Sequence, residues 1–263
     1  IAIYQIYALR LKYFPLIKIN YLNRGPIIIN SQITHDKIIE MIKLISNQYS
    51  LLKGGIFYYN SFIANDIFKL ENLKDIFFAN FFYKSYLTSI IDLTLSIDEL
   101  RKKLKGKWRN QLVKSEKCNA LEIDNQGINL NTIIDKQIKM VAKKKFNALN
   151  KDQLSQTLNL FKKERRLSIL LSKDIGNGNI EGYVCLIIIG KTALYYLGWS
   201  SLTGRKKNVS NFLLWQSVVF LKENGITKFD LGGYDNHLSP GISKFKKGMG
   251  GDEKEYFERL LKI

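Results

Sequence analysis

Apolar and polar residues follow two periodicities along the chain, and the clearest helical pattern lies near the C-terminus. Residues 209–224 carry apolar side chains at positions 209, 212, 213, 215, 218, 219 and 221, which form one broad helical face. Gly225 follows as the expected left-handed residue at the helix end. Residues 226–231 predict a short buried strand that ends at Gly232 and Gly233. The pattern therefore predicts a helix, a strand and a glycine turn in succession.

The rest of the chain divides into helices and strands by the same criteria. Ser96 and Glu99 form a capping box that opens a helix running to about residue 117. The buried stripe of this helix is expected to contain Leu100, Leu104, Trp108 and Leu112. Further helices are predicted at 34–49 with Thr34 as N-cap, at 131–145, and at 150–165 with an Asn150–Gln153 capping pair. Strands are predicted at 1–11, 16–22, 55–59, 85–93, 167–173, 180–189 and 192–199.

The order of elements in the second half indicates a fold class. Two helices, an antiparallel meander of three strands, and a final helix and strand follow one another. This is the order of an acetyltransferase-like (GNAT) unit, so we expect an α/β protein with mixed sheets.

Composition indicates a globular protein of one large domain or two of ordinary size. The chain has 263 residues, 46% hydrophobic and 12% aromatic, which is enough to build a core. No apolar run reaches the roughly 18 residues that a membrane span needs. Cys118 and Cys185 are too few and too separated for a disulfide framework or a metal site, so a cytoplasmic setting is expected. The chain begins at Ile1 rather than Met, so we expect further sequence upstream.

Charge points to the kind of partner. Lysine and arginine total 41 against 23 acidic residues, a formal net charge of +18. Such an excess favours a polyanion: nucleic acid, a nucleotide-phosphate substrate, or an anionic membrane surface. A general bias toward Lys, Ile and Asn codons is the alternative explanation. The partner interpretation is favoured because Lys244, Lys246 and Lys247 follow closely on the Gly232–Gly233 turn.

Two segments carry motifs beyond periodicity. The first joins LLWQSVVFLKENG, FDLGGYD and PGISKFKKGMGG between residues 213 and 251, and the second is KWRNQLVKSEK at 107–117. Together they resemble the Fem-type aminoacyltransferases (FemA, FemB and FemX), which build peptidoglycan cross-bridges. The resemblance implies two tandem GNAT-like units. The first, residues 1–124, looks N-terminally truncated and is completed by 252–263, and the second spans 125–251.

The same resemblance proposes a reaction centre. It places the family's Phe-Lys pair at Phe245 and Lys246. When an amine attacks an ester, the intermediate carries a negatively charged oxygen, which a lysine beside it would stabilise. The alternative is a solvated lysine run. The remaining residues that we predict to bind substrate are Arg109, Asn110, Lys114, Asp230, Gly232, Gly233, Tyr234 and Lys244.

Three of these predictions have specific chemical content. The resemblance makes Arg109 and Lys114 contacts to substrate phosphates, and a guanidinium pairs with phosphate through two hydrogen bonds. A merely solvated basic helix face is the alternative. Asp230 either orients substrate or caps the amides of the glycine turn, and capping is favoured because carboxylates commonly accept from amides two residues on.

The loop at 200–210 bears on the choice of donor. Acetyltransferases cradle the pyrophosphate of coenzyme A with an Arg/Gln-x-x-Gly-x-Gly/Ala pattern at a helix N-terminus. This pattern is absent, although Arg205, Lys206 and Lys207 still place positive charge there. The loop therefore favours a tRNA-borne donor over coenzyme A.

These observations support one leading hypothesis and two alternatives. The leading one is an enzyme without a cofactor that moves an amino acid from aminoacyl-tRNA to an amine of a nucleotide- or lipid-linked peptidoglycan precursor. It would work in the cytoplasm or at the inner face of the membrane. The first alternative is a GNAT-like N-acyltransferase that uses an acyl thioester on a sugar or small amine. The second is a non-enzymatic RNA-binding protein, whose binding would be salt-sensitive.

Overall fold

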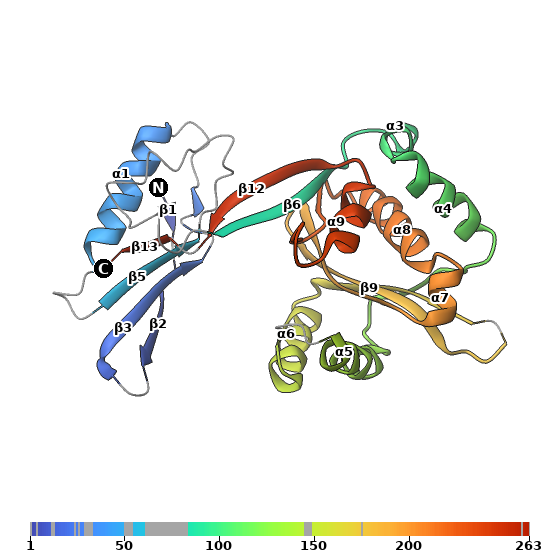
Figure 1. The fold of residues 1–263 in the computed structure, drawn as a ribbon, viewed down its shortest axis with the longest axis horizontal. Coiled ribbons are helices and arrows are strands. Elements are labelled where there is room, and N and C mark those ends of the chain that lie inside the picture. Colours follow the sequence, from blue (N-terminus) through green and yellow to red (C-terminus); the bar gives the residue numbers. More distant parts are fainter. Residues whose placement is uncertain are drawn as a thin grey trace. The chain divides into compact units, whose positions relative to one another are not determined.

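The structure, a computed structural model, divides the chain into two compact units. Unit 1 comprises residues 1–88 and 253–263, and unit 2 comprises residues 89–252 (Figure 1). The residues that the structure describes are 2–3, 5–11, 14–23, 25, 27–28, 34–49, 55–60, 84–144, 149–174, 176–258 and 260–262.

Unit 1 is built on a four-stranded sheet with the strand order β13-β5-β3-β2. Its elements are β1 (Ala2–Ile3), β2 (Tyr7–Leu11), β3 (Phe14–Asn23), β4 (Ile27–Ile28), α1 (His35–Asn47), β5 (Gly55–Asn60) and β13 (Leu260–Lys262). β5 runs parallel to β3, whereas β2 and β13 are antiparallel to their neighbours. The apolar side of α1 is buried through Ile38, Ile42 and Ile45, as its spacing predicts. Thr34 occupies the N-cap position of α1, but its side chain makes no capping hydrogen bond.

Unit 2 is built on a seven-stranded mixed sheet with the order β12-β6-β11-β10-β9-β8-β7. Within it, β8, β9 and β10 form the antiparallel meander that the sequence predicts, and β11 pairs in parallel with β10. The elements are β6 (Lys84–Asp92), α3 (Ile97–Lys103), α4 (Gly106–Glu116), β7 (Glu122–Asp124), α5 (Leu130–Lys144), α6 (Lys151–Lys163), β8 (Leu167–Lys173), β9 (Ile180–Ile189), β10 (Thr192–Ser200), α7 (Leu202–Lys206), α8 (Val209–Glu223), β11 (Lys228–Asp230), α9 (Pro240–Lys247) and β12 (Asp252–Glu258). β6 and β12 cross the division between the units.

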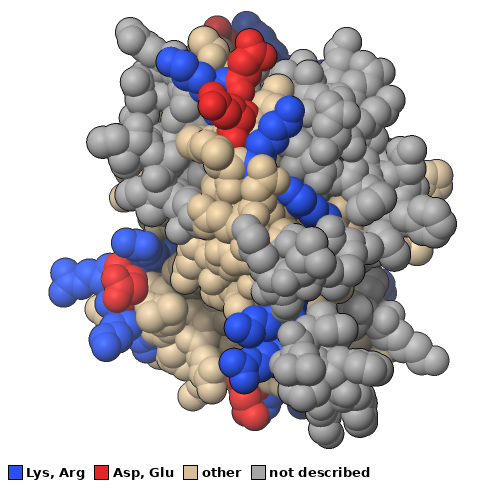
Figure 2. All heavy atoms as spheres, turned by 90° about the vertical axis from the view of Figure 1, so that its left-hand side faces the viewer, with Lys and Arg blue, Asp and Glu red and all other residues tan. Residues whose placement is uncertain are grey.

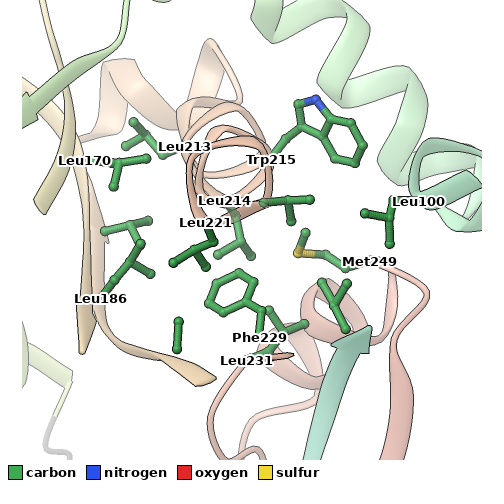
Figure 3. Packing of buried hydrophobic residues seen from close by; sticks show 14 of the residues in the cluster. Leu100, Leu170, Leu186, Leu213, Leu214, Trp215, Leu221, Phe229, Leu231 and Met249 are labelled. Carbon is green, nitrogen blue, oxygen red and sulfur yellow. The ribbon is translucent and has the colours of Figure 1, made fainter. Parts of the chain in front are cut away.

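Helices cover both faces of this sheet. α8 and α4 lie on one face, and α5 and α6 lie on the other (Figure 1). Figure 3 looks along α8 and shows apolar side chains around it, with Leu213 toward β8, Leu221 toward β9, and Trp215 toward α3 and α4. Because α8 is buried on almost every side, it anchors the elements that carry the candidate site.

The predicted helix between 96 and 117 is two helices. The Ser96–Glu99 capping box is present, but Leu104 is extended with φ −58° and ψ 131°, and a second helix begins at Gly106. The amide of Lys105 donates to the carbonyl of Gly248 at 2.9 Å, a tertiary bond that takes the place of a helical one. The predicted stripe is nevertheless buried on both helices: Leu100, Leu104, Trp108 and Leu112.

The division of the chain differs from the predicted boundary after residue 124. Residues 89–124 belong to unit 2, because α3 and α4 pack into the same hydrophobic cluster as α8 and β11. Residues 253–263 belong to unit 1, where β13 pairs with β5. Residues 253–263 thus belong to the same unit as residues 1–88. The division into two tandem GNAT-like units remains a prediction.

Two further observations concern the surface and the helices. On the face drawn in Figure 2, Lys and Arg side chains lie in several separate places, some beside Asp or Glu. On this face, the described cations therefore do not gather in a single patch.

Among the described residues, no helix is both long enough and apolar enough to cross a bilayer.

Candidate active site

The turn after β11 is held by its own side chain and by a glycine. Asp230 Oδ1 accepts a hydrogen bond from the amide of Gly232 at 2.8 Å, which is the capping role favoured from the sequence. Gly232 has φ +71°, and a Cβ there would lie 2.9 Å from the carbonyl oxygen of Tyr195. Only glycine fits this position without strain. The turn therefore brings the backbone close to β10 and presents the carbonyls of Gly232 and Gly233.

Lys246 binds those two carbonyls from α9. Its Nζ donates to Gly232 O at 3.0 Å and to Gly233 O at 2.8 Å, and the side chain is buried. Nζ also lies 5.4 Å from the centroid of the Tyr195 ring. Burial lowers the pKa of Lys246 to about 8, because the ammonium loses water, and the nearby Asp230 carboxylate opposes this shift only in part. The lysine is thus a buried cation whose hydrogen-bond acceptors are neutral.

The helix that carries Lys246 was not predicted from the sequence, which indicated only a lysine-rich segment. α9 has Pro240 in its first turn and Gly248 at its C-cap, and these two residues are the signal that would have identified it. Two contacts from the middle of α9 fix its position. Ser243 Oγ donates to the carbonyl of Asp235 at 2.9 Å, and the ring of Phe245 packs 5.9 Å from that of Trp108.

The glycines after α9 allow close packing against α3 and β6. Gly250 has φ +73°, and a Cβ there would lie 2.2 Å from the carbonyl oxygen of Lys103. A Cβ on Gly251 would lie 2.7 Å from Ser89 Oγ. Gly250 and Gly251 therefore seat the chain after α9 against the core of unit 2.

Two cavities lie against α9. The larger, which we call the β10 cavity, has a volume of about 580 Å³, and its lining includes β10 from Tyr195 to Ser200, Arg205, Ser210, Gly233, Phe245 and Lys246. The smaller, the α4 cavity, has a volume of about 330 Å³ and is lined by Lys105, Lys107, Trp108, Gln111, Gly241, Lys244, Phe245 and Gly248. None of the described residues lining either cavity is Asp, Glu or His. Both cavities therefore favour anionic ligands.

The structure brings together part of the predicted site. Phe245, Lys246 and Gly233 line the β10 cavity, and Lys244 lines the α4 cavity. Gly232 and Asp230 form the turn behind Lys246. Tyr234 is buried, and the ammonium of Lys247 lies 5.4 Å from its ring centroid.

The predicted phosphate contacts on α4 lie elsewhere. The side chains of Arg109, Asn110 and Lys114 are exposed and line neither cavity. Their role in binding substrate remains a prediction. The α4 residues that do line a cavity were interpreted from the sequence only as a charged helix face and a core tryptophan.

The basic loop before α8 is less positive than its sequence indicates. Lys207 Nζ pairs with Glu181 at 2.9 Å and with Asp174 at 3.3 Å, and the Glu181 side chain is only 6% exposed. These two carboxylates neutralise the Lys207 charge. Arg205 is exposed and lines the β10 cavity. The local positive charge thus comes from Arg205 and Lys206, not from all three residues.

The arrangement of sheet and helices is that of the GNAT-type acyltransferase fold. An acetyltransferase of the GNAT family from Colwellia psychrerythraea has a similar structure, with a TM-score of 0.52 at 11% identity over 91% of this chain and 77% of that one. FemX is similar over the whole chain: the TM-score is 0.73 at 15% identity, covering 98% of this chain and 85% of FemX. The expected α/β fold with mixed sheets and a GNAT-like arrangement is therefore confirmed, and the tandem arrangement of two such units remains a prediction.

A third similar structure is the C-terminal domain of a putative lysylphosphatidylglycerol synthetase from Agrobacterium fabrum. Its TM-score is 0.56 at 12% identity, covering 97% of this chain and 83% of that domain. No protein-family model matches the sequence, and neither does any curated protein. The likeness to known proteins is thus one of fold.

Proposed function

We propose that this protein is an acyltransferase that moves an amino acid from aminoacyl-tRNA to an amine of a cell-wall precursor peptide. The observation that carries the proposal is Lys246, a buried ammonium held by two carbonyls at the wall of a cavity free of described acidic residues. The likeness of fold to FemX supports the same reaction class. The net charge of +18 suits two polyanionic substrates.

Lys246 has the donor needed for this reaction. An ammonium has three N–H groups, and two of them are used by Gly232 and Gly233. The third is available to an oxygen in the cavity. When the acceptor amine attacks the ester carbonyl, this N–H stabilises the negative charge that develops on the carbonyl oxygen. Lys246 keeps its proton throughout and acts as an electrostatic catalyst.

The lining of the cavity also supports a particular path for the proton. The N–C bond forms and the ester C–O bond breaks, so the amine must lose a proton and the ribose oxygen must gain one. Because no described Asp, Glu or His lines the β10 cavity, no such side chain is in place as a base. The amine therefore reacts in its neutral form and passes its proton to the leaving ribose oxygen.

The test is transfer of a radiolabelled amino acid from charged tRNA. The acceptors are a nucleotide-linked muramyl pentapeptide, its lipid-linked form, and phosphatidylglycerol, which covers the lipid chemistry named for the third similar structure. Lys246→Met should reduce kcat by roughly 100- to 1,000-fold, the usual effect of losing one oxyanion donor. Lys247→Met removes the same charge from the same helix and should stay within about threefold of the wild type.

Two results would contradict the proposal. One is a folded wild-type protein that transfers label to none of the three acceptors. The other is a Lys246→Met variant as active as the wild type, which would remove Lys246 from the mechanism and leave only the likeness of fold.

One observation favours a second candidate, an N-acyltransferase that uses an acyl thioester. Ser210, in the first turn of α8, and Arg205 both line the β10 cavity, so a helix N-terminus and a cation border the same cavity. Coenzyme A has a pyrophosphate that such a wall would bind. A rise in melting temperature with coenzyme A, and none with muramyl peptide, would favour this candidate over the first.

A further inference from the structure

A third cavity lies between α5, α6 and β10, and its lining is apolar. We call it the α5–α6 cavity, and its volume is about 200 Å³. Gln137 and Tyr196 line it together with residues that have aliphatic side chains: Ile138, Val141, Leu149, Leu154 and Leu197. None of these described residues is charged, whereas each of the two cavities against α9 has a cation in its lining. The α5–α6 cavity therefore suits a different kind of group.

The size of this cavity suits one apolar group rather than a whole substrate. Small-molecule sites measure roughly 300–1,000 Å³, which is more than the α5–α6 cavity offers. An apolar cavity of roughly 150 Å³ stays free of water and can bind benzene. Leu154, at 3% exposed, belongs to the hydrophobic cluster that α5 and α6 form with the sheet, so this wall is held by the core. The cavity is thus preformed for an aliphatic group of a few carbons.

The α5–α6 cavity adjoins the candidate reaction centre. Gln137, Tyr196 and Leu197 border both this cavity and the β10 cavity. Tyr196 directly follows Tyr195, whose ring centroid lies 5.4 Å from Lys246 Nζ. Because a strand advances only about 3.3 Å per residue, an acyl group that reacts beside Lys246 can extend into the apolar cavity.

Gln137 is the polar residue at this junction. It is only 9% exposed, and its Oε1 accepts a hydrogen bond from the hydroxyl of Tyr183 at 2.9 Å. No described residue accepts a hydrogen bond from its Nε2. Gln137 therefore has a fixed position and a free donor for an oxygen of the ligand, next to a cavity that takes the apolar part.

We propose that the α5–α6 cavity holds the aliphatic side chain of the transferred amino acid, so that leucine or isoleucine is selected over glycine, alanine, serine and lysine. Assignment of the group to an amino acid rests on the proposed function, whereas the preference of the cavity for an aliphatic acyl group does not. Alanine and serine would leave most of the cavity empty. Lysine would bring a charge into a lining that contains no described acid to pair with it.

The experiment measures dissociation constants by calorimetry, so that it does not depend on transfer. The first probes are the stable amides of 3′-amino-3′-deoxyadenosine with leucine, alanine and phenylalanine, which represent the aminoacylated end of tRNA. The other probes are 4-methylpentanoyl-coenzyme A and acetyl-coenzyme A, which contrast a long and a short apolar chain as thioesters.

The variants change the α5–α6 cavity in both directions. Val141→Phe fills it, and Val141→Ala enlarges it. The matched control is Leu160→Phe, which places the same ring at an exposed position of α6 that lines none of the three cavities. Melting temperatures establish that each variant is folded.

The wild type should bind the leucine amide at least about tenfold more tightly than the alanine amide, because one methylene in an apolar pocket is worth roughly 10- to 200-fold. Val141→Phe should remove this preference, Leu160→Phe should retain it, and Val141→Ala should bind the phenylalanine amide more tightly than the wild type does. Equal affinity of the wild type for the leucine and alanine amides would overturn the proposal. So would a preference that Val141→Phe and Leu160→Phe leave equally intact. A preference seen only between the two thioesters would overturn the assignment to an amino acid.

The outcomes for the cavity and for the proposed function are separable. One tRNA, charged with leucine or alanine by an acylating ribozyme, is used as donor in the transfer assay, so that recognition of the tRNA stays constant. A preference for the leucine amide that depends on Val141, in a protein that transfers no amino acid, would retain the cavity and reject the function. Transfer of leucine and alanine at equal rates, unchanged in Val141→Phe, would do the reverse.

Discussion

Burial of Lys246 should make the stability of unit 2 rise with pH. The pKa of this lysine is about 8 in the folded protein, against an ordinary value of 10.5. The folded state therefore binds fewer protons than the unfolded state between these values, so the free energy of unfolding increases with pH across that window. The cost of the buried charge is complete below pH 8. At about 1.4 kcal/mol per pKa unit, it should fall by about 2 kcal/mol between pH 7 and pH 9.5.

The tryptophans allow this effect to be measured in unit 2 alone. All three, Trp108, Trp199 and Trp215, lie within residues 89–252, so their fluorescence reports the unfolding of that unit. Urea unfolding is followed at both pH values for the wild type and for Lys246→Met, which keeps the length of the side chain without its charge. From pH 7 to pH 9.5 the wild type should gain about 2 kcal/mol relative to the variant.

The comparison between proteins removes every titration that they share. Lys247→Met serves as a control, and its difference from the wild type should not change with pH by more than ~0.5 kcal/mol. If the difference between the wild type and Lys246→Met is the same at both pH values, the ammonium is not desolvated. A solvated ammonium at this position would stabilise the negatively charged oxygen of the intermediate much less than a buried one.

Three further predictions concern the elements around the site. Gly232→Ala should destabilise unit 2 by about 1–3 kcal/mol, because φ is +71° and the new Cβ would meet a backbone oxygen. An unchanged urea midpoint would contradict the turn geometry. Lys207→Met should lower the urea midpoint of unit 2 by leaving Glu181 buried without its partner, and adding Glu181→Gln should recover part of that loss. No recovery in the double variant would argue against a coupled pair. Ser96→Ala should cost about 1 kcal/mol through the lost capping box, whereas Ser155→Ala, at a half-buried position within α6, should cost little.

The sequence predicted a structural feature correctly wherever the feature depends on residues close to one another in the chain. The capping boxes at Ser96 and Asn150 are present, because each needs only residues three apart. The meander of β8, β9 and β10 followed from continuous apolar runs between glycine turns. Asp230 as a cap on the glycine turn was also predictable, since the bond spans two residues. Phe245 and Lys246 were proposed as the reaction centre from a motif, and the structure adds their position at a cavity wall.

Features that depend on residues far apart in the sequence appeared only in the tertiary structure. The interruption at Leu104 arises because the carbonyl of Gly248 takes the amide of Lys105, some 140 residues earlier in the chain. The charge of Lys207 is neutralised by Glu181, on β9, and by Asp174, just before β9, both of which lie more than 20 residues earlier in the chain. The sequence by itself thus determined most helices and strands of unit 2 and the residues worth testing, but neither α9 nor the break between α3 and α4. The charge state of Lys246, the pairing of Lys207 and the two cavities were decided by burial and by long-range contacts, which no local pattern encodes.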